Sequence, residues 1–109
     1  MTLSELSKTL ELTPLTHGFE DKTVSGCYIG DLLSWVMGRA QSGDVWITIM
    51  NNINIVAVAT LTDCAAILLC ENVSLSPEIT AKAEKEGVAV FSSEKTAFEL
   101  AVMLEKAMK

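Results

Sequence analysis

The chain has 109 residues, a formal net charge of −6 and a sequence pI of about 4.6, and 50% of its residues are hydrophobic. A chain of this length forms one domain that can bury its own core. The eight basic residues do not cluster. This excludes the basic footprint of a nucleic-acid-binding protein and disfavours binding to an anionic membrane.

No apolar run reaches the roughly 20 residues of a transmembrane helix. The N-terminal stretch MTLSELSKTL lacks the charged and apolar regions of a signal peptide, so we expect a cytoplasmic protein. The apolar content is high for so short a chain. A homodimer would cover the additional apolar surface. The alternative explanation is a sheet that is buried on both faces.

The N-terminal part of the chain is predicted to form short elements separated by a loop at His17–Gly26. They are a helix over Thr2–Thr9, a strand within Glu11–Leu15 confined to a sheet edge by Pro14, a strand over Cys27–Ile29, and a helix over Leu32–Ala40 with Asp31 as its N-cap. The last helix has a wide apolar stripe, made of Leu32, Leu33, Trp35, Val36 and Ala40.

The middle of the chain contains one ambiguity. Val45–Met50 is a predicted buried strand, and the β-branched stretch Asn51–Leu61 would make a hairpin with it by propensity alone. Against this, Asn52 or Asn54 could cap a short buried helix. A parallel partner for the strand Ala65–Cys70 also needs a crossover here. The pattern alone leaves both readings open.

The second half of the chain has clearer signals for where its helices begin and end. After the strand Ala65–Cys70, Ser76 is a predicted N-cap, Pro77 takes the first helical position and Gly87 ends the helix. Val88–Phe91 then reads as another strand. Short apolar runs with a helix between them predict βαβ units. We therefore expect a single α/β domain over residues 1–109, with three α/β/α layers and a small, mainly parallel sheet.

The final predicted helix is Glu94–Met108, capped by Ser92 or Ser93. Its apolar stripe is wider than one face of a sheet requires, which makes it the best candidate for a subunit contact. The alternative is that the N-terminal segment of the same chain covers it.

The sequence contains no pattern that predicts catalysis. Glycine-rich phosphate loops and a GxSxG elbow are absent, and the one histidine, His17, lies in a predicted loop. The three cysteines include no CxxC pair, and Cys64 and Cys70 flank a strand, where they are expected to be core residues. We expect no enzyme activity, no cofactor and no metal site.

Polar side chains follow the predicted parallel strands, where open α/β sheets bind ligands. A small polar ligand could be held there, with helix N-termini supplying N–H groups. The alternative is that these residues only form turns and caps. The candidate ligand-binding residues are Asn51, Asn52, Asn54, Glu71, Asn72, Ser92 and Ser93.

Several of these segments together resemble the short, stand-alone DRTGG-domain proteins, which are similar to the N-terminal domain of HPr serine kinase. The resemblance runs from about Leu3 to Leu104. Four segments carry it: GDLLS from Gly30 together with VM at 36–37, GDVWITI from Gly43, NIVAVA from Asn54, and the strand–loop–Ser-Pro-Glu–helix–strand of Ala65–Ser92. No literal DRTGG string is present, since the corresponding loop reads MNNINI over Met50–Ile55.

The resemblance implies an α/β fold, which favours a helix over Asn54–Leu61. The phosphate loop of HPr kinase lies in a domain that this chain lacks, so the resemblance does not imply kinase activity. Related domains are regulatory or dimerising pieces of larger proteins. Stand-alone members are encoded beside iron-only hydrogenase and electron-transfer subunits.

The leading functional hypothesis is thus a non-catalytic, homodimeric regulatory or protein-interaction module that works with a redox or signalling protein such as a hydrogenase. The alternative is a sensor that binds a nucleotide or anion at the carboxyl ends of the strands. A phosphotransferase remnant is a third and weaker hypothesis.

Overall fold

The computed structural model describes all residues from 1 to 109 and contains one five-stranded sheet in the order β1-β5-β4-β3-β2. Strands β2 to β5 are parallel, and β1 pairs antiparallel with β5. The strands are β1 Thr13–Pro14, β2 Gly26–Ile29, β3 Asp44–Thr48, β4 Ala66–Leu69 and β5 Val90–Ser92. The helices are α1 Leu3–Thr9, α2 Leu33–Arg39, α3 Asn54–Thr62, α4 Pro77–Lys85 and α5 Ala97–Ala107.

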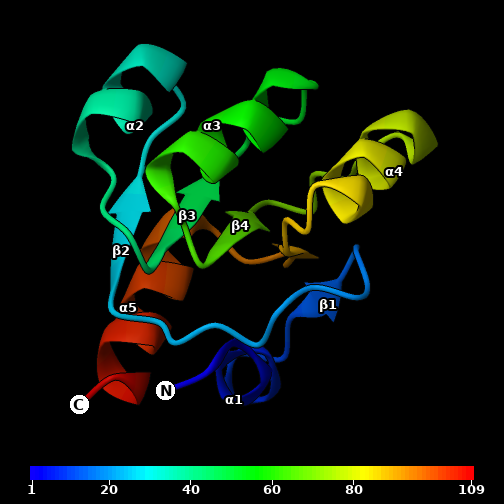
Figure 1. Cartoon of the computed structure of the whole chain (residues 1–109). Coiled ribbons are helices and arrows are strands. Elements are labelled where there is room, and N and C mark those ends of the chain that lie inside the picture. Colours follow the sequence, from blue (N-terminus) through cyan, green and yellow to red (C-terminus); the bar gives the residue numbers. More distant parts are fainter.

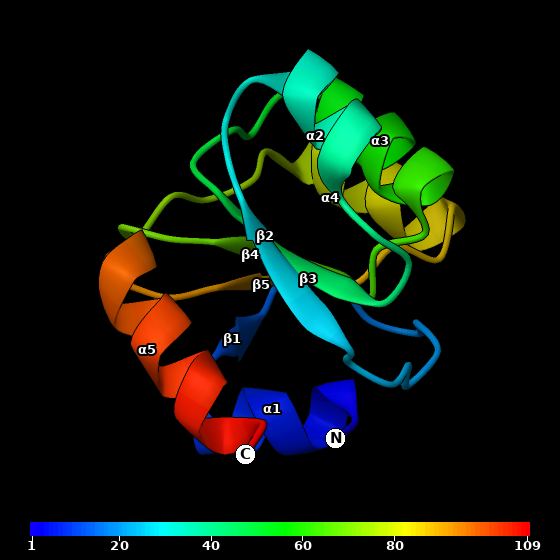
Figure 2. The same cartoon turned by 90° about the vertical axis from the view of Figure 1, so that its left-hand side faces the viewer.

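The helices form a layer on each side of the sheet. Helices α2, α3 and α4 cover one face, and α1 and α5 cover the other (Figures 1 and 2). Each face has its own apolar core, one containing Ile47, Leu68 and Leu100 and the other containing Trp46 and Ile67. The predicted α/β fold with a small, mainly parallel sheet is confirmed.

The two central strands explain why this sheet needs cover on both faces. Every residue of β3 and β4 is buried. A continuous apolar run is the usual sequence of a parallel strand enclosed by helices, because side chains on both faces enter a core. Trp46 pairs with Ile67 and points into one core, and Ile47 pairs with Leu68 and points into the other.

Helix α3 resolves the ambiguity in the middle of the chain. Asn54–Thr62 is helical, so the hairpin reading is wrong and the helix favoured by the family resemblance is confirmed. The physical reason is that β3 and β4 pair in parallel, and a parallel pair needs a crossover. The prediction that Asn52 or Asn54 caps this helix is wrong, since the N-cap is Ile53 and has no side-chain bond; the Asn52 Oδ1 accepts a hydrogen bond from the Asn54 N–H at 3.0 Å.

Two other predicted caps are also wrong. Asp31 does not cap α2, which begins without a side-chain cap; its Oδ1 instead accepts hydrogen bonds from the Thr48 hydroxyl and the Ile49 N–H. Neither Ser92 nor Ser93 caps α5, because the helix begins later, at a capping box formed by Thr96 and Glu99. In both places the predicted capping residue accepts hydrogen bonds from groups outside the helix: Asp31 from Thr48 and Ile49, and Ser93 from the Lys95 N–H.

Other local predictions are confirmed. Ser76 caps α4 through a hydrogen bond from the Ile79 N–H, β1 is an edge strand, and Cys64 and Cys70 are buried. The predicted apolar stripe of α2 is not a buried face, since Val36 alone is fully buried and Trp35 is 53% exposed. None of the five helices combines the length and apolarity needed to cross a membrane.

Candidate functional site

The seven candidate residues at the carboxyl ends of the strands fall into two groups. Asn51 and Asn52 lie in the connection from β3 to α3, Asn54 is the first residue of α3, and only Asn52 is partly buried. The Asn51 Nδ2 donates to the Ser74 carbonyl at 2.9 Å, which ties this connection to the one after β4. Asn51 therefore joins two loops and Asn52 bonds to the first turn of α3, and none of the three asparagines lines the cavity formed by the second group.

The second group meets beside β5. Asn72, Ser92 and Ser93 line a polar cavity of about 220 Å³, together with Glu11, Thr13, Glu94 and Lys95. Glu71 does not line this cavity. Its N–H donates to the Lys95 carbonyl, and the Asn72 N–H donates to the Ser93 carbonyl, both at 2.8 Å, so the connections after β4 and β5 are bonded to each other.

The topology explains why a cavity forms at this point. The helix that follows β4 and the helix that follows β5 lie on opposite faces of the sheet (Figure 2). A crevice opens where neighbouring strands send their connections to opposite faces, and ligands of open α/β sheets bind there. The group Asn72, Ser92 and Ser93 therefore lies at the topological switch point between β4 and β5.

A network that the sequence reasoning missed lies at the ends of β2 and β3. Thr48 is 1% exposed, and its hydroxyl donates to Asp31 at 2.8 Å and accepts from the Met50 N–H at 3.1 Å. The Trp46 Nε1 donates to the Gly30 carbonyl nearby. These bonds fasten the β2–α2 connection onto β3, and no short sequence motif signals them because the partners are far apart in the chain.

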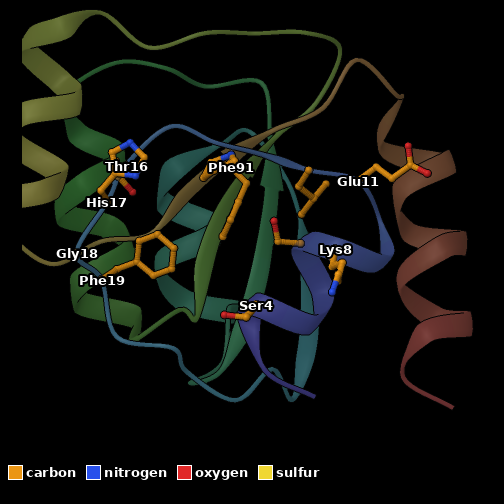
Figure 3. Close-up of a pocket in the computed structure, with 11 residues that line it drawn as sticks. Ser4, Lys8, Glu11, Thr16, His17, Gly18, Phe19 and Phe91 are labelled. Atoms are coloured by element: carbon orange, nitrogen blue, oxygen red, sulfur yellow. The ribbon is translucent and has the colours of Figure 1, made fainter.

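The largest cavity, of about 640 Å³, lies away from the strand ends, between α1 and the loop that follows β1 (Figure 3). His17 and Phe19 lie on one side of it, Lys8 on the other and Phe91 between them (Figure 3). Phe19 packs edge-on against Phe91, with ring centroids 5.5 Å apart. The cavity thus combines an aromatic floor with a polar rim, and the sequence reasoning did not identify it.

The cysteine thiols are poorly suited to nucleophilic chemistry. Cys27 is an exposed residue, but desolvation of its thiol by the surrounding protein and then the nearby Asp44 carboxylate raise its pKa to about 12. Burial is also the main cause that raises the pKa of Cys64 and of Cys70. All three side chains are therefore neutral thiols near pH 7. No group of three or more His, Cys, Asp and Glu residues is close enough to hold a metal ion.

Comparison with known proteins identifies the family. A search of curated protein sequences gave no match. Among solved structures, the chain is similar to the crystal structure of the CBS and DRTGG domains of the regulatory region of Clostridium perfringens pyrophosphatase, complexed with the activator diadenosine tetraphosphate. The TM-score is 0.74 at 15% sequence identity, and the match covers 97% of this chain but 46% of the other, so this chain spans about half the length of that relative. The family model of the DRTGG domain matches residues 6–107, and the chain therefore belongs to the DRTGG domain family.

Proposed function

We propose that this chain is a non-catalytic regulatory module that acts by binding. The observation that carries the proposal is its DRTGG domain, which extends over nearly the whole chain and shares its fold with part of a pyrophosphatase regulatory region. The raised pKa of all three thiols also supports a role without nucleophilic chemistry. In this proposal the chain works as a homodimer in the cytoplasm and is related to the N-terminal domain of HPr serine kinase.

The partner in this proposal is a redox enzyme, such as an iron-only hydrogenase or an electron-transfer subunit. Helix α2 and its N-cap residue offer a contact surface, because Leu32 at the N-cap is 60% exposed and Trp35 in the helix is 53% exposed. Exposed aromatic side chains are common anchors of protein interfaces. The test is biolayer interferometry with a purified iron-only hydrogenase of the same organism. We expect binding that Trp35→Ala weakens and that Leu61→Ala, at an exposed leucine of α3, leaves unchanged. No binding at 100 µM hydrogenase would refute this partner.

A second candidate function is a sensor of a small phosphate-bearing ligand. It is favoured by the crevice at the β4–β5 switch point, where Asn72, Ser92 and Ser93 supply neutral donors. Lys95 supplies a cation there, beside the carboxylates of Glu11 and Glu94. A volume of about 220 Å³ suits a single phosphate or an acyl phosphate. The larger cavity beside Phe91 has room for a nucleotide and an aromatic floor for its base, with Lys8 at its rim.

A thermal-shift experiment separates these two cavities. The probes are inorganic phosphate, acetyl phosphate, ATP and diadenosine tetraphosphate. A probe at 100 times its dissociation constant adds about 2.7 kcal/mol to stability, which raises the Tm by on the order of 10 °C. If the switch-point crevice binds it, Lys95→Ala removes the shift; if the larger cavity binds it, Lys8→Ala removes it. Lys106→Ala is the matched control, and flat curves for all probes would refute the sensor.

A further inference from the structure

Strand β2 is an unprotected edge of the sheet. It pairs only with β3, and it lies at the front of the molecule in Figure 2 with α5 below it. Its four residues contain no charge and no proline. The opposite edge, β1, is only two residues long and includes Pro14, which has no N–H to donate. Proteins usually protect an exposed edge, because its free backbone groups pair readily with another strand.

Helix α5 leaves apolar side chains beside this edge. A cavity of about 400 Å³ runs between the two elements, lined by Cys27 and Ile29 of β2 and by Ala101 and Met108 of α5, among others. Ile29 is 47% exposed and Phe98, on the same side of α5, is 76% exposed. We call this surface the β2 face and define it by six residues: Cys27, Ile29, Phe98, Ala101, Val102 and Met108.

We propose that a second copy of this chain covers the β2 face. In this dimer, β2 pairs antiparallel with β2 of the second copy about a twofold axis perpendicular to the sheet. The two α5 helices pack side by side and antiparallel beneath the joined strands. The inference rests on the homodimer of the proposed function and adds the surface that forms it.

The backbone of β2 complements itself. The Gly30 N–H donates to the Ile47 carbonyl of β3. Because alternate residues of a parallel strand direct their N–H and C=O groups to the same side, Cys27 and Ile29 direct theirs away from β3. A twofold axis through Tyr28 places Cys27 opposite Ile29 of the second copy, and the reverse. Cys27 of each copy and Ile29 of the other then exchange backbone hydrogen bonds. A twofold axis perpendicular to the sheet relates two strands only when they are antiparallel.

The charges near this edge are few. Two copies that each carry a net charge of −6 repel one another, whereas β2 itself is uncharged. The one charged residue that lines the cavity beside β2 is Glu105 of α5, and its carboxylate forms an ion pair with Lys109 of the same chain at 3.3 Å. Because Pro14 protects the other edge, the association stops at a dimer and does not grow into a filament.

Sedimentation equilibrium of the full chain tests the proposal. We expect twice the chain mass of 11.8 kDa for the wild type. Val102→Glu places two carboxylates near the axis, and Ile29→Lys places a charge in the strand seam. Each should weaken the dimer by about 30-fold or more, as expected for the centre of an interface. Leu61→Glu, at a leucine of α3 that is 71% exposed, is the matched control and should remain dimeric.

Amide hydrogen exchange of the wild type, followed by NMR, gives an independent readout that needs no substitution. In the dimer the Cys27 and Ile29 amides should be protected, and dilution to the monomer should release them while Tyr28 stays protected. A monomeric wild type at 200 µM would overturn the proposal. So would a dimer in which both substitutions leave the mass unchanged or in which the Cys27 and Ile29 amides exchange freely. A dimer that both substitutions leave unchanged would overturn the β2 face alone, whereas a monomeric wild type would also overturn the homodimer of the proposed function. Neither result affects the phosphate and nucleotide test.

Discussion

Replacing Thr16 by valine should destabilise the protein strongly, although the two side chains have nearly the same shape. Thr16 is fully buried, and its hydroxyl donates to the Val88 carbonyl at 3.1 Å and accepts from the Val90 N–H at 3.0 Å. Valine removes both bonds and leaves a buried carbonyl and a buried N–H without partners. Each such group costs about 1–3 kcal/mol, and the added methyl returns about 0.8 kcal/mol. For two such groups we expect a net loss of about 1–5 kcal/mol.

The measurement is urea unfolding of wild type, Thr16→Val and Thr16→Ser at one protein concentration, because a dimer makes the midpoint depend on concentration. Thr16→Ser keeps the hydroxyl and loses one methyl, so it should cost about 1 kcal/mol. The order of the two variants separates hydrogen bonding from packing. If Thr16→Ser is less stable than Thr16→Val, or if valine changes stability by less than about 0.5 kcal/mol, the reasoning is refuted.

Three further predictions concern local contacts. Asp31→Ala deprives the buried Thr48 hydroxyl of its acceptor and should cost about 1–3 kcal/mol in thermal unfolding, whereas Asp31→Asn should recover most of it. Gly43→Ala should be worse than Gly87→Ala, because both have positive φ but only at Gly43 does an added Cβ collide with a side chain. If both variants lose the same stability in thermal unfolding, the positive φ alone explains the loss and the collision at Gly43 contributes nothing. The N–H and hydroxyl of the α5 N-cap residue lower the pKa of Glu99. Because this pKa is lower in the folded state, the ionised carboxylate stabilises the fold above about pH 4.5, and this stabilisation is lost as the pH falls. The Tm difference between wild type and Glu99→Gln should therefore shrink below that pH.

The parts of the fold that could be predicted from the sequence depend on local signals. Helix α4 begins at Ser76 and Pro77 and ends before Gly87, and all three act within one turn of the helix end. The buried strands β3 and β4 were predictable because each is a continuous apolar run, and such a run reports burial on both faces. For α3 the local pattern was ambiguous, and the choice depended on the pairing of β3 with β4.

The features that could not be predicted join residues far apart in the chain. Asp31 is a residue type that often caps helices, but its hydrogen-bond partner Thr48 is 17 residues away, at the end of β3. The cavity beside Phe91 is closed by a loop that Thr16 fastens to β5 across 72 to 74 residues. No periodic pattern marks such contacts. The helical stripe of α2 is a further case, since periodicity predicts an apolar side but does not predict that Trp35 stays exposed.

The candidate ligand residues divide for a topological reason. Strands β2, β3, β4 and β5 follow one another across the sheet, and right-handed crossovers in a constant direction place α2, α3 and α4 on the same face. The crevice of an open α/β sheet forms where connections leave to opposite sides, so none is expected beside β3, and Asn51 there bonds to the neighbouring loop. Helix α5 has no following strand to return to and crosses to the other face, so the crevice opens beside β5. Residues after β3 and after β5 look alike in the sequence, and only the order of the strands shows that Asn72, Ser92 and Ser93 line one cavity.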